Sequence, residues 1–212
     1  MRLAIFDFDE TVVGFKTMFR FLAYADPGHA AVISEMQDMS ARGMSRSTVN
    51  RYYYRRFAGI THLELANKAN AWFEQERRHG LPLITWTCAE ITRRRASGDR
   101  IVIVTGSFPE AIAPFRSLLG IDEVLAANLE VIDGKFTGDL VGDPVIGEGK
   151  AKALLKYATE VGADLSKCSA YGDHGSDVEM LSLVKEAIAV NPCPQLRAHA
   201  VACGWAIVET SD

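Results

Sequence analysis

Short, almost unbroken apolar runs alternate along this chain with segments of helical periodicity. Three runs are rich in β-branched residues, namely LAIF at 3–6, RIVIVTG at 100–106 and AIAV at 187–190, and CSAYGD at 168–173 adds a fourth. Such runs are typical of parallel strands that are buried on both faces of a sheet. The alternation predicts a doubly wound α/β fold with a Rossmann-like core and a parallel sheet.

Helical segments follow or precede these strands. The pattern predicts helices over 109–120, 149–162 and 176–184. Gly120 and Gly162 are suitable C-cap residues for the first two helices, and Ser176 is a suitable N-cap for the third. Asp133-Gly134, between the alternating segments of 129–141, predicts a β-hairpin.

The stretch between the first two strands has a different texture. It reads as consecutive helices with little β signal, over 15–25, 30–43, 48–59, 61–80 and 83–98. A helical block inserted directly after the first strand predicts a cap over the sheet. We therefore expect a core made of 1–13 and 97–212, and an inserted α-helical cap domain over 14–96.

Composition narrows the class of protein. The 212 residues are 48% hydrophobic and 24% charged, which suits one globular domain or a core with one insertion. A net charge of −4 disfavours a sequence-independent nucleic-acid binder. The first apolar run turns acidic after a few residues, and no later run is long enough for a membrane span. We expect a cytoplasmic monomer or homodimer with no nucleic-acid or membrane partner.

Polar side chains follow three of the predicted strands. Asp7 and Asp9 end the first strand, Thr105-Gly106-Ser107 ends the second, and Asp173 follows the CSAYG run. In open α/β sheets, ligands bind beyond the carboxyl ends of the strands. These side chains are therefore expected to share one site.

Carboxylates at these strand ends suit a hard cation. Asp7, Asp9, Asp173 and Asp177 offer the oxygen ligands that Mg²⁺ prefers, whereas no His/Cys cluster suggests zinc. The cation would also remove the repulsion between neighbouring carboxylates.

A phosphate fits the other side of such a site. Thr105, backbone N–H groups near Gly106, and Lys150 offer donors and a positive charge to it. A carboxylate could then attack phosphorus while its neighbour transfers a proton.

Four motifs, DFDET, VTGSF, GEGK and GDHGSDVEML, resemble in sequence and order those of the haloacid dehalogenase-like (HAD) phosphatases. The resemblance covers the whole chain and is closest to the phosphoserine-phosphatase-like branch (subfamily IB), which has a helical C1 cap. It implies that Asp7 is the nucleophile and Asp9 the general acid/base. It also implies that Thr105 and Lys150, rather than Lys152, bind the phosphoryl oxygens beside Gly106 and Ser107. Mg²⁺ would lie on Asp7, the Asp9 carbonyl and Asp173, with Asp177 supporting or ligating.

One position departs from the pattern of that branch. In phosphoserine phosphatases, a Glu shortly after the first motif contacts the ammonium group of the substrate. The corresponding position in this sequence is Lys16. A positively charged side chain repels a protonated amino group and attracts an anion or a hydroxyl group. We expect Lys16 to contact a small phosphorylated metabolite other than phosphoserine.

The basic segment around RYYYRRFAG permits two interpretations. It is either an amphipathic helix with solvated arginines, or a helix from which one Arg reaches an anionic group of the substrate. The candidates are Arg46, Arg51, Arg55 and Arg56.

The function expected from these residues is Mg²⁺-dependent hydrolysis of a phosphomonoester through an aspartyl-phosphate. A phosphotransferase or mutase on the same fold is the alternative within enzymes, because an alcohol can replace water as the acceptor. A non-enzymatic phospholigand-binding module is less favoured, because Asp7, Asp9, Lys150 and Asp173 are all present.

Overall fold

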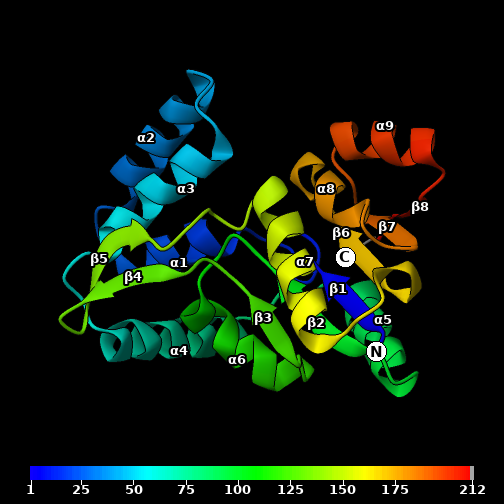
Figure 1. Cartoon of the computed structure of the whole chain (residues 1–212). Coiled ribbons are helices and arrows are strands. Elements are labelled where there is room, and N and C mark those ends of the chain that lie inside the picture. The colour runs from blue at the N-terminus through cyan, green and yellow to red at the C-terminus, as the bar shows by residue number, and fades with distance from the viewer. Residues whose placement is uncertain (211–212) are drawn as a thin grey trace.

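A six-stranded parallel sheet lies at the centre of the protein (Figure 1). The computed structural model describes residues 1–210. The strand order is β3-β2-β1-β6-β7-β8, and every neighbouring pair is parallel. The strands are β1 Leu3–Phe6, β2 Arg100–Val104, β3 Glu123–Leu125, β6 Ser169–Gly172, β7 Glu186–Val190 and β8 Ala206–Val208. The predicted α/β fold with a parallel sheet is confirmed, and the short strands β3 and β8 are additions to it.

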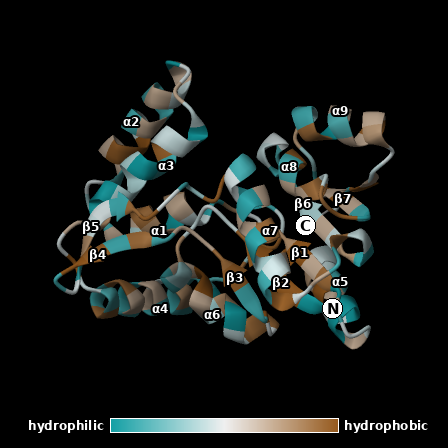
Figure 2. Ribbon diagram, in the orientation of Figure 1, coloured by the Kyte–Doolittle hydropathy of each residue, from teal (hydrophilic) through white to brown (hydrophobic). Residues whose placement is uncertain are grey.

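Helices cover both faces of this sheet because its strands are apolar on both sides (Figure 2). In β1, Leu3 and Ile5 face one hydrophobic cluster, whereas Ala4 and Phe6 face the other. The first cluster contains residues of α7 Glu148–Val161, α8 Val178–Leu181 and α9 Pro194–Cys203. The second contains residues of α5 Thr85–Ala96 and α6 Pro109–Leu119. In the described part of the chain, no helix is long and apolar enough to cross a membrane.

The helices inserted after β1 form a layer beside the sheet, together with a two-stranded hairpin (Figure 1). They are α1 Thr17–Ala25, α2 His29–Ala41, α3 Arg46–Tyr54, the 3-10 turn η1 Arg55–Phe57, and α4 His62–Arg78. The hairpin strands are β4 Leu129–Ile132 and β5 Lys135–Leu140. Its turn has positive φ at Asp133 (51°) and Gly134 (74°), as the predicted Asp-Gly turn requires.

A cluster of aromatic rings joins the inserted helices to the core. Phe21 of α1 packs edge-on against Phe57, Trp72 and Phe108, with ring centroids 5.1–6.1 Å apart. Phe108 immediately precedes α6, so the cluster spans the two parts of the chain. Fully buried rings of this size supply a large share of the hydrophobic stabilisation.

Helix α5 packs against the sheet. Its Arg94 Nε donates a hydrogen bond to the Tyr171 hydroxyl of β6 at 2.7 Å, and Arg94 also pairs with Glu186 of β7. We expected a cap over 14–96, and the division between core and cap stays a prediction. These contacts favour a boundary before Thr85.

The segment predicted as a helix over 176–184 is shorter in the structure. A 3-10 turn, η3 Gly175–Asp177, begins at the N-cap residue His174 and leads into α8, which ends at Leu181. The Asp177 carboxylate turns back to accept hydrogen bonds from the N–H groups of Asp173 (3.2 Å) and His174 (3.0 Å). The first turn is therefore tighter than an α-helix, and the chain turns again to enter β7.

Candidate active site

Three adjacent strands deliver polar side chains to one edge of the sheet. Asp7 follows β1, Thr105 follows β2 and Asp173 follows β6, and β1 lies between the other two strands. The Asp7 N–H donates to the carbonyl of Tyr171 at 2.9 Å, which fixes where β1 ends relative to β6. All three side chains line one cavity, as expected for the carboxyl ends of parallel strands.

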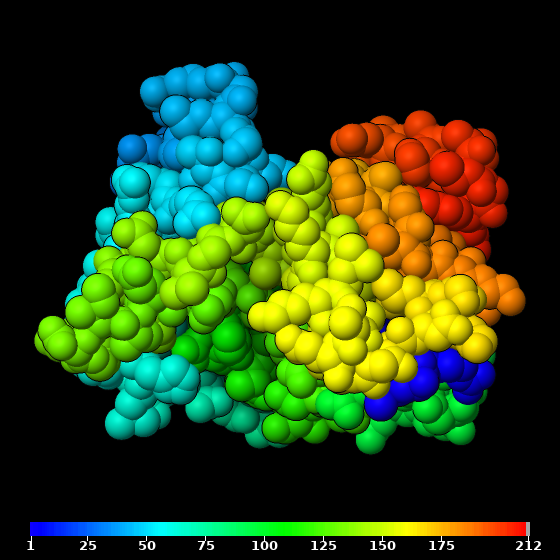
Figure 3. Space-filling model, viewed as in Figure 1, coloured from blue at the N-terminus to red at the C-terminus, as the bar shows by residue number. Residues whose placement is uncertain are grey.

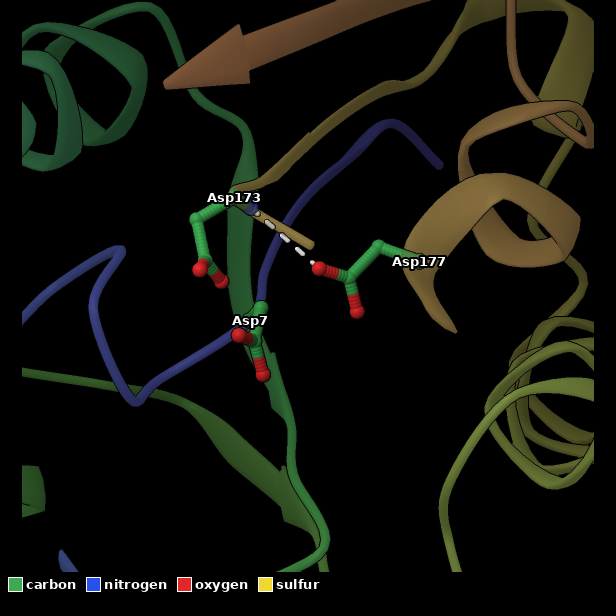
Figure 4. Close-up of side chains that lie close together, drawn as sticks. All are labelled: Asp7, Asp173 and Asp177. Atoms are coloured by element: carbon green, nitrogen blue, oxygen red, sulfur yellow. Dashed lines mark hydrogen bonds between the residues drawn. The ribbon is translucent and has the colours of Figure 1, made fainter. Parts of the chain in front are cut away.

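Asp7, Asp173 and Asp177 form a buried carboxylate cluster (Figure 4). Each offers one oxygen within 4.8 Å of the others. The Lys150 ammonium, in the first turn of α7, donates to Asp7 Oδ1 and to Asp177 Oδ1 at 2.5 Å each. The structure thus brings together residues that are up to 170 positions apart in the sequence.

This cluster carries more negative than positive charge. Burial raises the pKa of Asp7, although the ammonium of Lys150 opposes that shift. Burial, together with the charges of Asp7 and Asp177, raises the pKa of Asp173 to about 9. Burial alone would lower the pKa of Lys150, but the carboxylates of Asp177 and Asp7 raise it above its ordinary value.

A divalent cation fits this donor set. One ammonium cannot compensate three buried carboxylates, and an uncompensated buried charge is costly. The oxygens of Asp7, Asp173 and Asp177 are hard ligands, close enough together to share one ion. The cluster therefore matches the chemistry of Mg²⁺, which accepts a few carboxylates and keeps its remaining positions for water or phosphate.

Asp9 is held apart from this cluster. Its carboxylate accepts a hydrogen bond from the Thr17 hydroxyl at the start of α1. Burial raises the pKa of Asp9 to about 7, with the Thr17 hydrogen bond opposing the shift and the charge of Asp7 adding to it. A carboxyl group that titrates near neutral pH can both donate and accept a proton, which general acid–base catalysis requires.

The loop after β2 supplies hydrogen-bond donors on the opposite side. Thr105 and Ser107 are buried, and the Ser107 N–H donates to Thr105 Oγ1 at 3.1 Å. Helix α6 begins two residues later, at Pro109, so the loop runs directly into the first turn of that helix. Gly106 leaves no room for a side chain, since a Cβ there would lie 2.8 Å from Ile146.

A cavity of about 310 Å³ lies between these loops and the inserted helices. Figure 3 shows a notch in the surface between the α2–α3 lobe and the part that carries α8 and α9. The loop residues Gly106 and Ser107 line the cavity together with Lys16. Lys16 is half-exposed and pairs with Glu10 at 3.3 Å. On the side of the inserted helices, the cavity wall is mixed: Met18, Phe19, Met36 and Val49 are apolar, and Ser40, Arg46 and Asn50 are polar.

The four candidate arginines lie in different places. Arg46 lines the cavity, where its guanidinium contacts His174 Nδ1 (2.6 Å) and Ser176 Oγ (3.3 Å). Arg51 donates to the carbonyl of Gly142 at 2.6 Å, Arg56 pairs with Asp26 at 2.8 Å, and Arg55 is exposed. Arg46 is thus the one placed to meet a bound molecule.

Some residues of the site were not identified from the sequence. His174 is one of them, although it follows Asp173 within the GDHGSDVEML motif and could have been selected on that ground. Thr17, Asn50 and Tyr54 reach the site from the inserted helices, and their partners lie 8, 56 and 52 residues away. A pattern of neighbouring residues in the sequence does not predict contacts of this kind.

Comparison with known proteins matches most of this sequence to one protein family. Residues 4–182 match the haloacid dehalogenase-like hydrolases. Phosphoserine phosphatase SerB1 of Mycobacterium tuberculosis is 40% identical over 52% of this chain and 36% of its own length. A probable phosphatase of the same organism is 29% identical, over 98% of this chain and 75% of that protein. The chain thus matches only about a third of the length of SerB1.

Solved structures share the whole fold. A protein of unknown function from Bordetella pertussis Tohama I superposes with a TM-score of 0.87 at 26% identity, covering 98% of this chain and 97% of that one. A substrate-bound phosphoserine phosphatase superposes with a TM-score of 0.73 at 23% identity, covering 100% and 94%. At that level of identity the second likeness concerns the fold alone.

Proposed function

Because the chain belongs to the haloacid dehalogenase-like hydrolase family, we propose that it is a phosphatase that hydrolyses a small phosphomonoester through an aspartyl-phosphate on Asp7. The observation that carries the proposal is the buried cluster of Asp7, Asp173 and Asp177, in which Lys150 bonds Asp7 and Asp177 while Asp7 and Asp173 line the cavity. Phosphatases among the relatives support the same class of reaction.

Two displacements at phosphorus make up the proposed reaction. An Asp7 carboxylate oxygen attacks phosphorus, the bond to the ester oxygen breaks, and Asp9 gives its proton to the leaving alcohol. Water then attacks the phosphorus of the aspartyl-phosphate and loses a proton to Asp9. The bond to Asp7 breaks and inorganic phosphate leaves.

The remaining site residues position the phosphoryl group. Thr105, Gly106 and Ser107 offer donors on one side, and the Lys150 ammonium offers a positive charge on the other. Asp7, the main-chain carbonyl of Asp9, Asp173 and Asp177 would hold Mg²⁺, which neutralises phosphoryl charge when it is bound.

The leaving group is proposed to be an alcohol without an amine near the phosphate. Lys16 lines the cavity and would repel an ammonium. Glu10 also lines it and pairs with Lys16 at 3.3 Å, so an amine would have to compete with Lys16 for that carboxylate. Arg46 gives the cavity a further cation that suits a second anionic group.

Phosphate release from p-nitrophenyl phosphate and from a panel of metabolite monoesters tests the proposal. We expect turnover that requires Mg²⁺ and is abolished in Asp7→Asn. Transfer of the phosphoryl group to an added alcohol, without release of phosphate, would instead identify a phosphotransferase. A parent protein that turns over no phosphate ester would contradict the proposal.

The same panel tests the role of Lys16. Lys16→Glu is expected to move preference toward esters that carry an amine, such as phosphoserine. Lys152→Glu is a matched control, because Lys152 is exposed and lies outside the cavity, paired with Asp143 at 3.2 Å. Unchanged preferences in Lys16→Glu would remove the argument against phosphoserine.

A further inference from the structure

Two side chains of α3 converge on one carbonyl oxygen of the loop after β2. The Tyr54 hydroxyl donates to the carbonyl of Gly106 at 2.7 Å, and Asn50 Nδ2 donates to the same oxygen at 3.0 Å. The two residues are one helical turn apart, so they share a face of α3. A carbonyl oxygen has two lone pairs, and here two buried donors can occupy both.

These hydrogen bonds fix the peptide plane between Gly106 and Ser107. In a trans peptide the C=O and the N–H point in opposite directions. With the carbonyl directed at α3, the Ser107 N–H points the other way, where it donates to Thr105 Oγ1 at 3.1 Å. Thr105 Oγ1 is then an acceptor for the loop, and its own hydrogen is left to donate toward the cavity that Thr105 lines.

The ends of the loop are held differently from its middle. The Thr105 N–H donates to the carbonyl of Leu125 at 2.9 Å, and the Ala127 N–H donates to the carbonyl of Ser107 at 2.8 Å. Both partners follow β2 along the chain. The central carbonyl, on Gly106, is instead held by the helix inserted after β1.

We propose that Asn50 and Tyr54 are positioning residues, which orient the phosphate-binding loop 105–107 from α3 and make its donor geometry depend on the docking of that helix. The inference rests on the proposed phosphatase function. Neither side chain needs to touch phosphorus: each acts through the carbonyl of Gly106 and the hydroxyl of Thr105. When one of the two side chains is removed, a single hydrogen bond to the Gly106 carbonyl remains to orient the peptide plane.

Tyr54→Phe tests this role, and the adjacent Tyr53→Phe is its matched control. Both tyrosines are fully buried in α3, but within residues 1–210 the Tyr53 hydroxyl has no hydrogen-bond partner. A net hydrogen bond is worth about 1 kcal/mol, so we expect Tyr54→Phe to lower kcat by roughly fivefold with little change in KM. Tyr53→Phe should leave kcat unchanged.

A second readout does not depend on turnover. Inorganic phosphate with Mg²⁺ should raise the melting temperature of the parent, and Tyr54→Phe should need several-fold more phosphate for the same rise. The double variant Asn50→Ala/Tyr54→Phe should lose more than the product of the single losses, because both donors hold one oxygen. Phosphate carries no leaving group, so the place of Asn50 in the cavity wall does not confuse this comparison.

The outcomes separate the two proposals. Equal kcat and equal phosphate affinity in Tyr54→Phe and Tyr53→Phe would overturn the positioning role, as would a loss of melting temperature in Tyr54→Phe with both of those quantities unchanged. A parent that releases phosphate from no ester would contradict the phosphatase proposal. In that case the phosphate titration would still decide the role of Tyr54.

Discussion

At the scale of single residues, the Lys150 ammonium is the only cation that contacts the carboxylate cluster within the described chain. Lys150→Met leaves Asp7 and Asp177 buried without a cation, and breaking such an ion pair costs about 3–5 kcal/mol. We expect a loss of this size in the free energy of unfolding, measured by urea denaturation without Mg²⁺. Added Mg²⁺ should recover part of the loss, because the ion takes over the compensation.

Lys152 provides the control for this experiment, two residues further along α7. Its side chain is 64% exposed and pairs with Asp143, whose side chain is 68% exposed. Exposed pairs contribute about 0–1 kcal/mol, so Lys152→Met should change stability by no more than this. Equal losses in the two variants would show that the cluster does not depend on Lys150.

Gly149 illustrates a second constraint at the residue scale. A Cβ at this position would lie 2.0 Å from the carbonyl oxygen of Pro144, which is backbone and cannot move aside easily. Inside a helix, Gly→Ala ordinarily gains about 1 kcal/mol. For Gly149→Ala we expect the opposite sign, a loss of about 1–3 kcal/mol, measured by urea unfolding.

Gly14→Ala is the matched control for that substitution. Its Cβ would make only an ordinary contact, 3.8 Å from the carbonyl of Pro82, and its φ is not positive. The variant should therefore retain the parent's stability. A gain in stability for Gly149→Ala would contradict the packing argument.

At the scale of elements, Glu90 links α5 to the sheet by accepting a hydrogen bond from the Tyr171 hydroxyl of β6, and Arg93 and Arg94 of α5 itself donate to the same carboxylate. Burial raises the pKa of Glu90, but these hydrogen bonds outweigh burial and lower it from 4.5 to about 2. The folded state therefore holds this proton less tightly than the unfolded state. The resulting stability is complete above pH 4.5 and is lost as the pH falls toward 2.

Glu90→Gln removes this titration. Between pH 4.5 and 2, the free energy of unfolding should fall less steeply with decreasing pH in the variant than in the parent. Urea denaturation at a series of pH values gives both curves. Parallel curves over this range would show that Glu90 does not attach α5 in the way described.

Helices and strands could be predicted from the sequence wherever a short stretch of residues carried its own pattern. The apolar runs of β1, β2, β6 and β7 and the Asp133-Gly134 turn each carry their own pattern, and the structure has them. Strands β3 and β8 have three residues each and are partly exposed, so no apolar run marks them. The predicted helix after β6 is longer than the observed one. The hydrogen bond from the Asp173 N–H to the Asp177 carboxylate shapes the start of this segment, and the spacing of apolar residues does not reveal such a bond.

At the scale of the whole molecule, the candidate site was predictable for a topological reason. Parallel strands end at one edge, so polar residues after β1, β2 and β6 had to meet if those strands were neighbours. The four motifs in their order supplied the family resemblance, which the match over residues 4–182 confirms. The contributions of the inserted helices could not be read in this way, because Asn50 and Tyr54 meet Gly106 only through tertiary packing.

The walls of the site limit the size of a molecule that it can hold. The cavity of about 310 Å³ has walls from both the inserted helices and the core loops, and Arg46 contacts His174 and Ser176 across it. For the proposed phosphatase, a small monoester would fit this volume, whereas a phosphoserine within a peptide chain would extend against the inserted helices that form one wall. Where a ligand binds only a more open arrangement of these helices, its apparent affinity is reduced by the fraction of the protein in that arrangement. We therefore expect kcat/KM to be lower for a phosphopeptide than for p-nitrophenyl phosphate. Arg46→Ala, which removes the contact across the cavity, should narrow the gap by favouring opening. Equal kcat/KM for the peptide and the small ester in the parent would show that the inserted helices do not restrict access.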